Sequence, residues 1–225
     1  MYSLLVADDH PLFRDALQAV ISGSLIDSQL LEAESLADAM SLIEQQAALD
    51  LLLLDLSLPD AEGLEGLTRL REAFPWLPVA IISAHQDRQL VLDAITLGAV
   101  GYIPKSTPRE ALLEALAQIL KGQLYLPPDV MRRPVPRMSS LPTASKMNTS
   151  SERLARLTDK QLAVLECMAK GQSNKQIARE LLIAETTVKT HVSAILRKLN
   201  ATSRVHAIVV AGEEDLSVYQ ANRHR

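Results

Sequence analysis

The sequence predicts two domains in tandem: an α/β domain with a five-stranded, doubly wound parallel sheet, followed by a small all-α domain. Three observations support this prediction. Five short apolar runs alternate with five segments of helical period over residues 1–126. A proline-rich segment without apolar periodicity follows. The charge then changes sign, because residues 1–126 carry 18 acidic and 7 basic side chains (net −11) and residues 127–225 carry 9 and 16 (net +7). An acidic half followed by a basic half indicates that the second half binds a polyanion.

The strands of the first domain are expected at the apolar runs and the helices between them. The runs are Leu4–Ala7, Gln29–Ala33, Asp50–Leu54, Val79–Ile82 and Gly101–Ile103. The helical segments are Leu12–Ile21, Leu36–Gln46, Leu64–Ala73, Gln89–Leu97 and Arg109–Leu120. Strict alternation favours right-handed crossovers that place helices on both faces of the sheet. The run of four leucines that ends at Leu54 is typical of a strand covered on both faces.

Residues 127–151 are predicted to be a flexible linker, because they contain five prolines and many serines and threonines. Helices follow in residues 152–214. Thr158 to Gln161 has the form of a capping box and opens one helix, and Gly171 is a plausible stop. A second helix is expected at Ile177–Leu182, and a third at about Thr186–Leu199. Residues 215–225 are interpreted as a tail.

The rest of the composition is that of an ordinary globular protein of 225 residues, with 48% apolar and 22% charged side chains. A single cysteine, Cys167, excludes an intramolecular disulfide and a multi-cysteine metal site. Cys167 and Trp76 are interpreted as packing residues. The N-terminus lacks the features of a signal peptide, and no apolar run approaches the length that spans a bilayer. We therefore expect a cytoplasmic protein without a membrane partner.

Polar residues stand at the ends of four of the predicted strands. They are Asp8, Asp9, Asp55, Ser83 and Lys105. In a parallel sheet they meet at one edge, where open α/β sheets bind ligands. Each one alone is typical of a cap, a turn or a solvated charge. Together they would be costly to bury without a divalent cation and a phosphoryl group to balance their charge. The set therefore predicts an aspartate that accepts phosphate.

The third helix of the basic half has two contrasting faces at 100° per residue. The apolar arc contains Val188, Val192, Ile195, Leu196 and Leu199. The second arc, without an acidic residue, contains Lys189, Thr190, Ser193 and Arg197. Such a face suits the major groove of DNA, and His191 and Lys198 on its flank suit phosphate contacts. The alternative is an ordinary amphipathic helix with a solvated basic face.

Several motifs, taken in their order along the chain, resemble the pattern of a known family. The segments ADDHPLFR, LLLLDLSLPDAEG, IISA and GYIPKS resemble the receiver domain of two-component response regulators, which has a flavodoxin-like fold. The segment from Leu157 to Ala207, which begins LTDKQLAVLECMAKG, resembles a LuxR-type helix-turn-helix domain. The resemblance covers nearly all of the chain except the linker and the tail. It implies a transcription regulator that is not an enzyme, that a sensor histidine kinase phosphorylates, and that binds double-stranded DNA as a homodimer.

The resemblance also assigns roles to the polar residues. Asp55 is the expected phosphoacceptor, with Lys105 and Ser83 placed to contact the phosphoryl oxygens. Magnesium (Mg2+) would take Asp9, Asp55 and the backbone carbonyl of Ser57 as ligands, with Asp8 acting through bound water. In the family the aromatic ring at the position of Tyr102 turns inward when the hydroxyl at the position of Ser83 moves toward phosphate. The alternative interpretation is that Tyr102 is an ordinary core residue.

Two departures from the family pattern and two other function classes remain. Ala184 stands where the family commonly has a serine N-cap, at an expected loss of about 1 kcal/mol that Glu185 offsets in part. Pro104 precedes Lys105, whereas many receivers have a proline after the lysine.

The alternative functions are a metal-dependent phosphohydrolase with an aspartyl-phosphate intermediate, and a DNA-binding protein whose receiver serves protein contacts alone.

Overall fold

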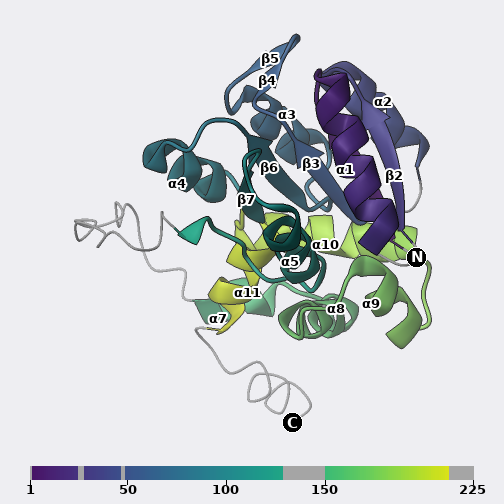
Figure 1. Cartoon of the computed structure of the whole chain (residues 1–225). Helices are drawn as coiled ribbons and strands as arrows, with labels where there is room; N and C mark the ends of the chain where they lie inside the picture. Colours follow the sequence, from purple (N-terminus) through teal and green to yellow (C-terminus); the bar gives the residue numbers. More distant parts are fainter. Residues whose placement is uncertain (1, 25–27, 47–48, 129–149, 213–225) are drawn as a thin grey trace.

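The computed structural model describes residues 2–24, 28–46, 49–128 and 150–212 (Figure 1). The first domain has the predicted five-stranded parallel sheet, with strand order β2-β1-β3-β6-β7. Its strands are β1 (Tyr2–Ala7), β2 (Ser28–Ala33), β3 (Leu51–Leu54), β6 (Val79–Ser83) and β7 (Gly101–Pro104). The strand order reverses direction beside β1, which is the doubly wound arrangement that the alternating pattern predicts.

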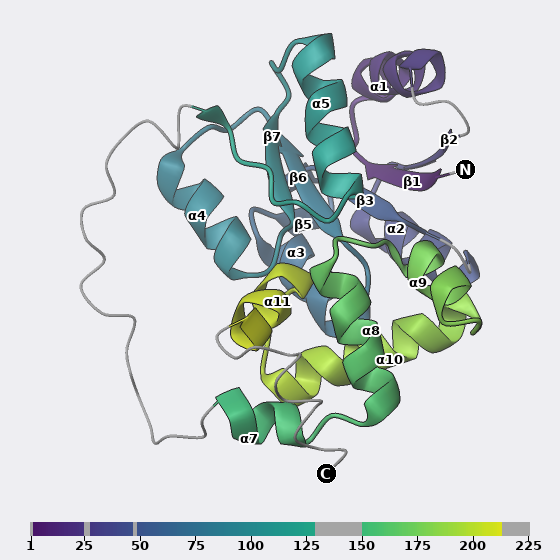
Figure 2. The ribbon, with the colours of Figure 1, turned by 90° about the horizontal axis from the view of Figure 1, so that it is seen from below.

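Helices cover both faces of the sheet (Figure 2). One face carries α1 (Pro11–Ser24) and α5 (Arg109–Leu120), and the other carries α2 (Leu36–Gln45), α3 (Glu65–Ala73) and α4 (Arg88–Thr96). The leucines of β3 alternate between the two cores, since Leu51 and Leu53 belong to the α1/α5 side and Leu52 and Leu54 to the other. Burial on both faces explains why this strand is apolar throughout.

A short antiparallel hairpin that the sequence reasoning missed follows β3. It consists of β4 (Ser57–Leu58) and β5 (Ala61–Glu62). Asp60 at its turn accepts hydrogen bonds of 2.8 Å from the backbone N–H groups of Leu36 and Ala37, in the first turn of α2. The carboxylate satisfies two N–H groups that the helix cannot pair internally. These bonds attach the hairpin, and with it the chain just beyond Asp55, to the body of the domain.

The second domain consists of five described helices. They are α7 (Ser150–Ala155), α8 (Asp159–Ala169), α9 (Asn174–Glu180), α10 (Glu185–Leu199) and α11 (Arg204–Gly212). The predicted capping box of α8 is present, with Thr158 and Gln161 bonded reciprocally. The second predicted helix ends earlier than expected, because Leu182 has a left-handed φ of 53° that no helix continues through. Ala184 at the N-cap of α10 makes no side-chain cap bond, as expected.

The two domains pack together at the amino-terminal edge of the sheet, opposite the edge where the strand-end carboxylates lie (Figures 1 and 2). Contacts come from the loops that lead into β6 and β7 and from the turn after α5, where a Cβ atom on Gly122 would lie 3.1 Å from the Cα atom of Gly171. Trp76 packs on the core of the second domain. The hydroxyl of Thr202 lies 3.3 Å from the carbonyl oxygen of Thr96. A Cβ atom on Gly98, whose φ is +101°, would lie 2.4 Å from the carbonyl oxygen of Thr202, so this approach requires glycine.

Some predicted boundaries lie outside the described residues. The predicted linker falls almost wholly on residues 129–149 and the predicted tail on 215–225. At the linker's end α7 begins at Ser150, earlier than the expected domain start at residue 152. Leu154, which is fully buried in the second core, holds this turn against the domain. Among the described helices, none is long and apolar enough to cross a membrane.

Candidate functional site

The five strand-end residues converge at the carboxyl edge of the sheet. Asp8 and Asp9 follow β1, Asp55 follows β3, Ser83 ends β6 and Lys105 follows β7. The ammonium nitrogen of Lys105 lies 2.7 Å from Asp8 Oδ2 and 2.8 Å from Asp55 Oδ2. Asp8 and Ser83 are fully buried and Asp55 is 3% exposed. The geometry that the parallel sheet implied is therefore present for these residues.

Lys105 supplies the positive charge that two buried carboxylates require. Burial alone would lower its pKa, but hydrogen bonds and charge attraction from Asp55 and Asp8 outweigh burial and raise the pKa above its ordinary value. The same ammonium lies 4.9 Å from the centre of the Phe13 ring, on α1. Because both carboxylates share one ammonium, a second cation in this pocket would relieve the remaining negative charge.

Arg14 of α1 fixes the loop that carries the acidic pair, and sequence reasoning missed it. Its Nη1 donates to the backbone carbonyl oxygen of Asp8 over 2.6 Å. Its other nitrogens pair with Glu32 Oε2 at 3.0 Å and Glu34 Oε1 at 2.6 Å, at and just beyond the end of β2. An arginine on the buried stripe of a helix, beside two glutamates of the neighbouring strand, was the signal that could have revealed it.

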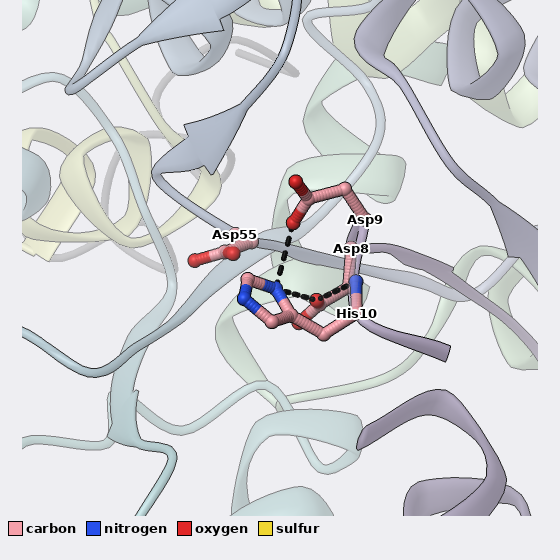
Figure 3. A group of neighbouring side chains, drawn as sticks. All are labelled: Asp8, Asp9, His10 and Asp55. Atoms are coloured by element: carbon pink, nitrogen blue, oxygen red, sulfur yellow. Dashed lines mark hydrogen bonds and ion pairs between the residues drawn. The ribbon is translucent and has the colours of Figure 1, made fainter. Parts of the chain in front are cut away.

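The acidic pocket contains a set of oxygen and nitrogen atoms that fits a divalent cation (Figure 3). Ligand atoms of Asp8, Asp9, His10 and Asp55 all lie within 4.8 Å of one another, slightly more than the separation of about 4.2 Å between opposite ligands of Mg2+ with bonds of about 2.1 Å. Carboxylate oxygens are the ligands that Mg2+ takes in proteins, so the residues fit the predicted ion. Ser57, the predicted carbonyl ligand, is the exposed first residue of β4. His10 was not among the predicted ligands.

Ser83 and Tyr102 occupy one hydrogen-bonded corner beside the pocket. The Tyr102 ring is fully buried, and its hydroxyl donates to the carbonyl oxygen of His85 over 2.7 Å. The backbone N–H of His85 donates to Ser83 Oγ over 3.2 Å. Burial raises the pKa of Tyr102, and the nearby Asp55 charge acts in the same direction. The ring thus lies inward, close to the residue predicted to contact phosphate.

The predicted DNA-binding face of α10 is not fully available in this conformation. Lys189 is 8% exposed, and its ammonium lies 3.8 Å from the centre of the Trp76 ring in the first domain. Burial lowers the pKa of Lys189, and attraction by Glu185 and Asp50 opposes that shift. Trp76 is therefore a packing residue, as expected, and the partner on which it packs is the other domain.

The other predicted DNA-binding residues lie in three settings. Thr190 and Ser193 donate their hydroxyls to backbone carbonyls one turn earlier, those of Thr186 and Lys189, over 3.0 Å each. Lys198 donates to the carbonyl oxygen of Arg156 and to Gln161 Oε1, both at 2.8 Å, so it ties α10 to the α7–α8 connection. Arg197 is exposed and His191 is half-buried. The predicted apolar arc forms the buried side of the helix.

Comparisons with known proteins match both domains. Residues 4–117 match the family model described as the response regulator receiver domain. Residues 155–211 match the model described as bacterial regulatory proteins, luxR family. Together the two matches cover the sheet with its acidic pocket and the helices around α10.

Two curated relatives match this chain along nearly its whole length, and a solved structure matches part of it. A "Glycerol metabolism activator" from Pseudomonas putida is 52% identical, over 97% of this chain and 99% of that protein. The "Nitrate/nitrite response regulator protein NarL" from Escherichia coli strain K12 is 34% identical, over 94% of this chain and 95% of its own. Among solved structures, a LuxR family DNA-binding response regulator from Silicibacter pomeroyi is 32% identical with a TM-score of 0.52, covering 57% of this chain and 99% of that one.

Proposed function

The chain belongs to the response regulators that join a receiver domain to a LuxR-type DNA-binding domain and is a transcriptional regulator, and we propose that phosphorylation of Asp55 controls its binding to DNA. One observation carries the proposal. Asp8, Asp55 and Lys105 form a buried charge cluster at the carboxyl edge of the sheet, with Ser83 beside it. The domain division proposed from the sequence, 1–126 and 152–214 with a linker between, goes with this function.

Asp55 is the nucleophile in the proposed reaction. One of its carboxylate oxygens forms a bond to phosphorus while the bond from phosphorus to the donor breaks, and the donor keeps the bonding electrons. The donor is a phosphohistidine of a sensor kinase or a small phosphodonor. Phosphoryl transfer needs little covalent help from a protein beyond positioning and charge stabilisation. Asp55 Oδ1 accepts a 2.8 Å hydrogen bond from the N–H of Leu56, which orients the carboxylate.

The neighbouring residues hold the charge that the phosphoryl group brings. Asp8, Asp9 and Asp55, with the carbonyl of Ser57, would hold Mg2+, which when bound neutralises phosphoryl oxygens. Lys105 then exchanges part of its pairing with the carboxylates for a phosphoryl oxygen, and Ser83 donates its hydroxyl to another. The Tyr102 ring, which already lies inward, is proposed to move with the Ser83 hydroxyl when that hydroxyl turns toward the phosphoryl group. The second domain packs on the opposite edge of the sheet, so it leaves the edge at which β3 ends open to the proposed donor while the domains are in contact.

The second domain is proposed to bind duplex DNA through α10 after the domains separate. Thr190, Ser193, Arg197 and Lys189 would face the major groove, with His191 and Lys198 nearer the phosphates. In the conformation described, Lys189 is buried against Trp76 instead. Phosphorylation would favour separation and pairing of two receivers, so that a homodimer reads two half-sites. Solved structures titled as RcsB dimers on DNA, at 20% identity, share the fold.

Labelling tests the acceptor. Tag-free wild type, Asp55→Asn and the matched control Asp93→Asn, an exposed aspartate on α4, are incubated with a labelled small phosphodonor and magnesium. Wild type and Asp93→Asn should take up label and retain it, and Asp55→Asn should not. Equal labelling of Asp55→Asn would refute the acceptor. Continuous phosphate release at enzymatic rates would favour a phosphohydrolase instead. DNA binding that never responds to the phosphodonor would favour a receiver used for protein contacts alone.

A further inference from the structure

His10 is the one member of the acidic pocket that offers nitrogen in place of oxygen. Its Nδ1 lies 2.7 Å from Asp9 Oδ1 and 3.1 Å from Asp8 Oδ1, and all three atoms point toward one another in Figure 3. Two cis ligands on a cation with bonds of about 2.1 Å are about 3.0 Å apart. The nitrogen, which pairs with both carboxylates here, therefore lies from each oxygen at about the separation of two neighbouring ligands on one cation.

The local sequence explains why the ring points into the pocket. Pro11 is the first residue of α1, and a residue before proline is restricted to extended conformations. The backbone of His10 is held further by three hydrogen bonds. Its N–H donates to Asp8 Oδ1 over 2.9 Å, and its carbonyl oxygen accepts from the N–H groups of Phe13 over 3.1 Å and Arg14 over 3.2 Å. The side chain is 62% exposed, so a cation can reach the nitrogen from solvent.

We propose that His10 is an additional ligand of the cation site and makes that site prefer Mn2+, Co2+ and Zn2+ over Mg2+ more strongly than its carboxylates would. Imidazole nitrogen suits these transition metals, whereas Mg2+ takes oxygen ligands and keeps its waters. The inference rests on the proposed function, because it assumes that the acidic pocket binds a cation. Lys105 does not compete for the same atoms, since it pairs with Asp8 Oδ2 and Asp55 Oδ2.

Calorimetric titration of the full-length, tag-free protein with each of the four metals tests the preference. The variants are His10→Ala, the matched control His85→Ala, and Asp8→Asn. His85 is an exposed histidine near the same edge whose ring is not in the donor set. His10→Ala should bind Mn2+, Co2+ and Zn2+ at least about tenfold more weakly while its affinity for Mg2+ changes by less than about twofold. His85→Ala should match wild type, and Asp8→Asn should bind all four metals more weakly.

A spectroscopic measurement checks that the nitrogen itself is bound. Pulsed electron paramagnetic resonance of the Mn2+ complex should show coupling to a nitrogen nucleus in wild type and His85→Ala and none in His10→Ala. Circular dichroism confirms that the variants are folded. Two results would overturn the proposal. If His10→Ala binds every cation more tightly, the imidazole occupies the cation's place; if its affinities equal those of wild type, the ring is a bystander.

The proposed function and this inference fail separately. Wild type that neither binds Mg2+ nor takes label on Asp55 contradicts the proposed function. Wild type that binds Mg2+ and takes label, but whose metal preference does not depend on His10, contradicts the inference alone.

Discussion

Replacing Trp76 should release α10 from the receiver and raise the DNA affinity of the unphosphorylated protein. The Trp76 ring is the surface on which the Lys189 ammonium rests, at 3.8 Å, and Lys189 is 8% exposed there. Trp76 also contacts Phe74 edge to face, with ring centres 6.5 Å apart, so its position is fixed from the receiver side. Trp76→Leu removes the ring face while keeping an apolar side chain that packs in the receiver.

The magnitude follows from the contact. A cation over a tryptophan face contributes about 0.5–1 kcal/mol when exposed and about 2 kcal/mol when desolvated. The charge of Lys189 is itself costly to bury, as its lowered pKa indicates, and this cost offsets part of the gain. We call the conformation with the two domains in contact the closed state, and the conformation with the domains separated the open state. We therefore expect Trp76→Leu to destabilise the closed state by about 1–2 kcal/mol, a factor of about 5 to 30 in the equilibrium between closed and open protein. Where the closed state dominates, apparent Kd for DNA falls by the same factor.

Fluorescence anisotropy with a labelled duplex, selected from random sequence by phosphorylated wild type, measures that change at one fixed salt concentration. Trp76→Phe is the matched control, because it keeps a smaller ring and should give an intermediate affinity. After phosphorylation, wild type and Trp76→Leu should bind alike. Trp76 is the single tryptophan of the chain, so its own emission in wild type should also shift when the phosphodonor opens the protein. Equal affinity of unphosphorylated wild type and a well-folded Trp76→Leu would refute the proposed closure.

Two further predictions concern the lysines. Lys105→Met should lower the free energy of unfolding by about 2–3 kcal/mol at neutral pH without added metal, because it leaves Asp8 and Asp55 buried without their shared cation. The variant should therefore unfold at a lower temperature. Since pairing raises the pKa of Lys105 above 10.5, its stabilisation is complete below pH 10.5 and is lost as pH rises through the folded-state pKa, so wild type and variant should converge in alkaline thermal scans. Lys198→Ala should cost about 1 kcal/mol of stability in addition to DNA affinity, because Lys198 bonds to Arg156 and Gln161; unchanged denaturant midpoints would contradict this.

The fold of the first domain could be predicted because its signals are local and repeated. A few residues are enough to predict burial on both faces for the all-leucine strand 51–54, and burial of one face for the apolar stripe of α5. The hairpin of β4 and β5 could not, since strands of two residues are too short to show a period of two. The predicted end of α9 was too late, because Leu182 ends the helix region in a left-handed conformation that is usually marked in a sequence by glycine.

The candidate site divides in the same way. Strand-end position is enough to bring Asp8, Asp55 and Lys105 together, because parallel strands align their carboxyl ends. The roles of Arg14 and His10 depend on which way a side chain points from the first turn of α1, which the sequence does not state directly. The contact of Trp76 with Lys189 depends on how two domains meet, and no periodicity within either domain encodes that surface.

Lys189 links the proposed DNA site to the state of the receiver through simple exclusion. One ammonium cannot lie over the Trp76 ring and against a DNA backbone or base edge at the same time, so domain closure and DNA binding compete for it. The coupling is reciprocal, and DNA should therefore favour the same open protein that phosphorylation is proposed to favour. The strand β7 connects the two ends of this competition. Lys105 follows its last residue, and Gly98, which lies against Thr202 of the second domain, is three residues before its first. A shift of β7 toward a phosphorylated Asp55 would thus disturb the domain contact directly, without a longer chain of intermediates.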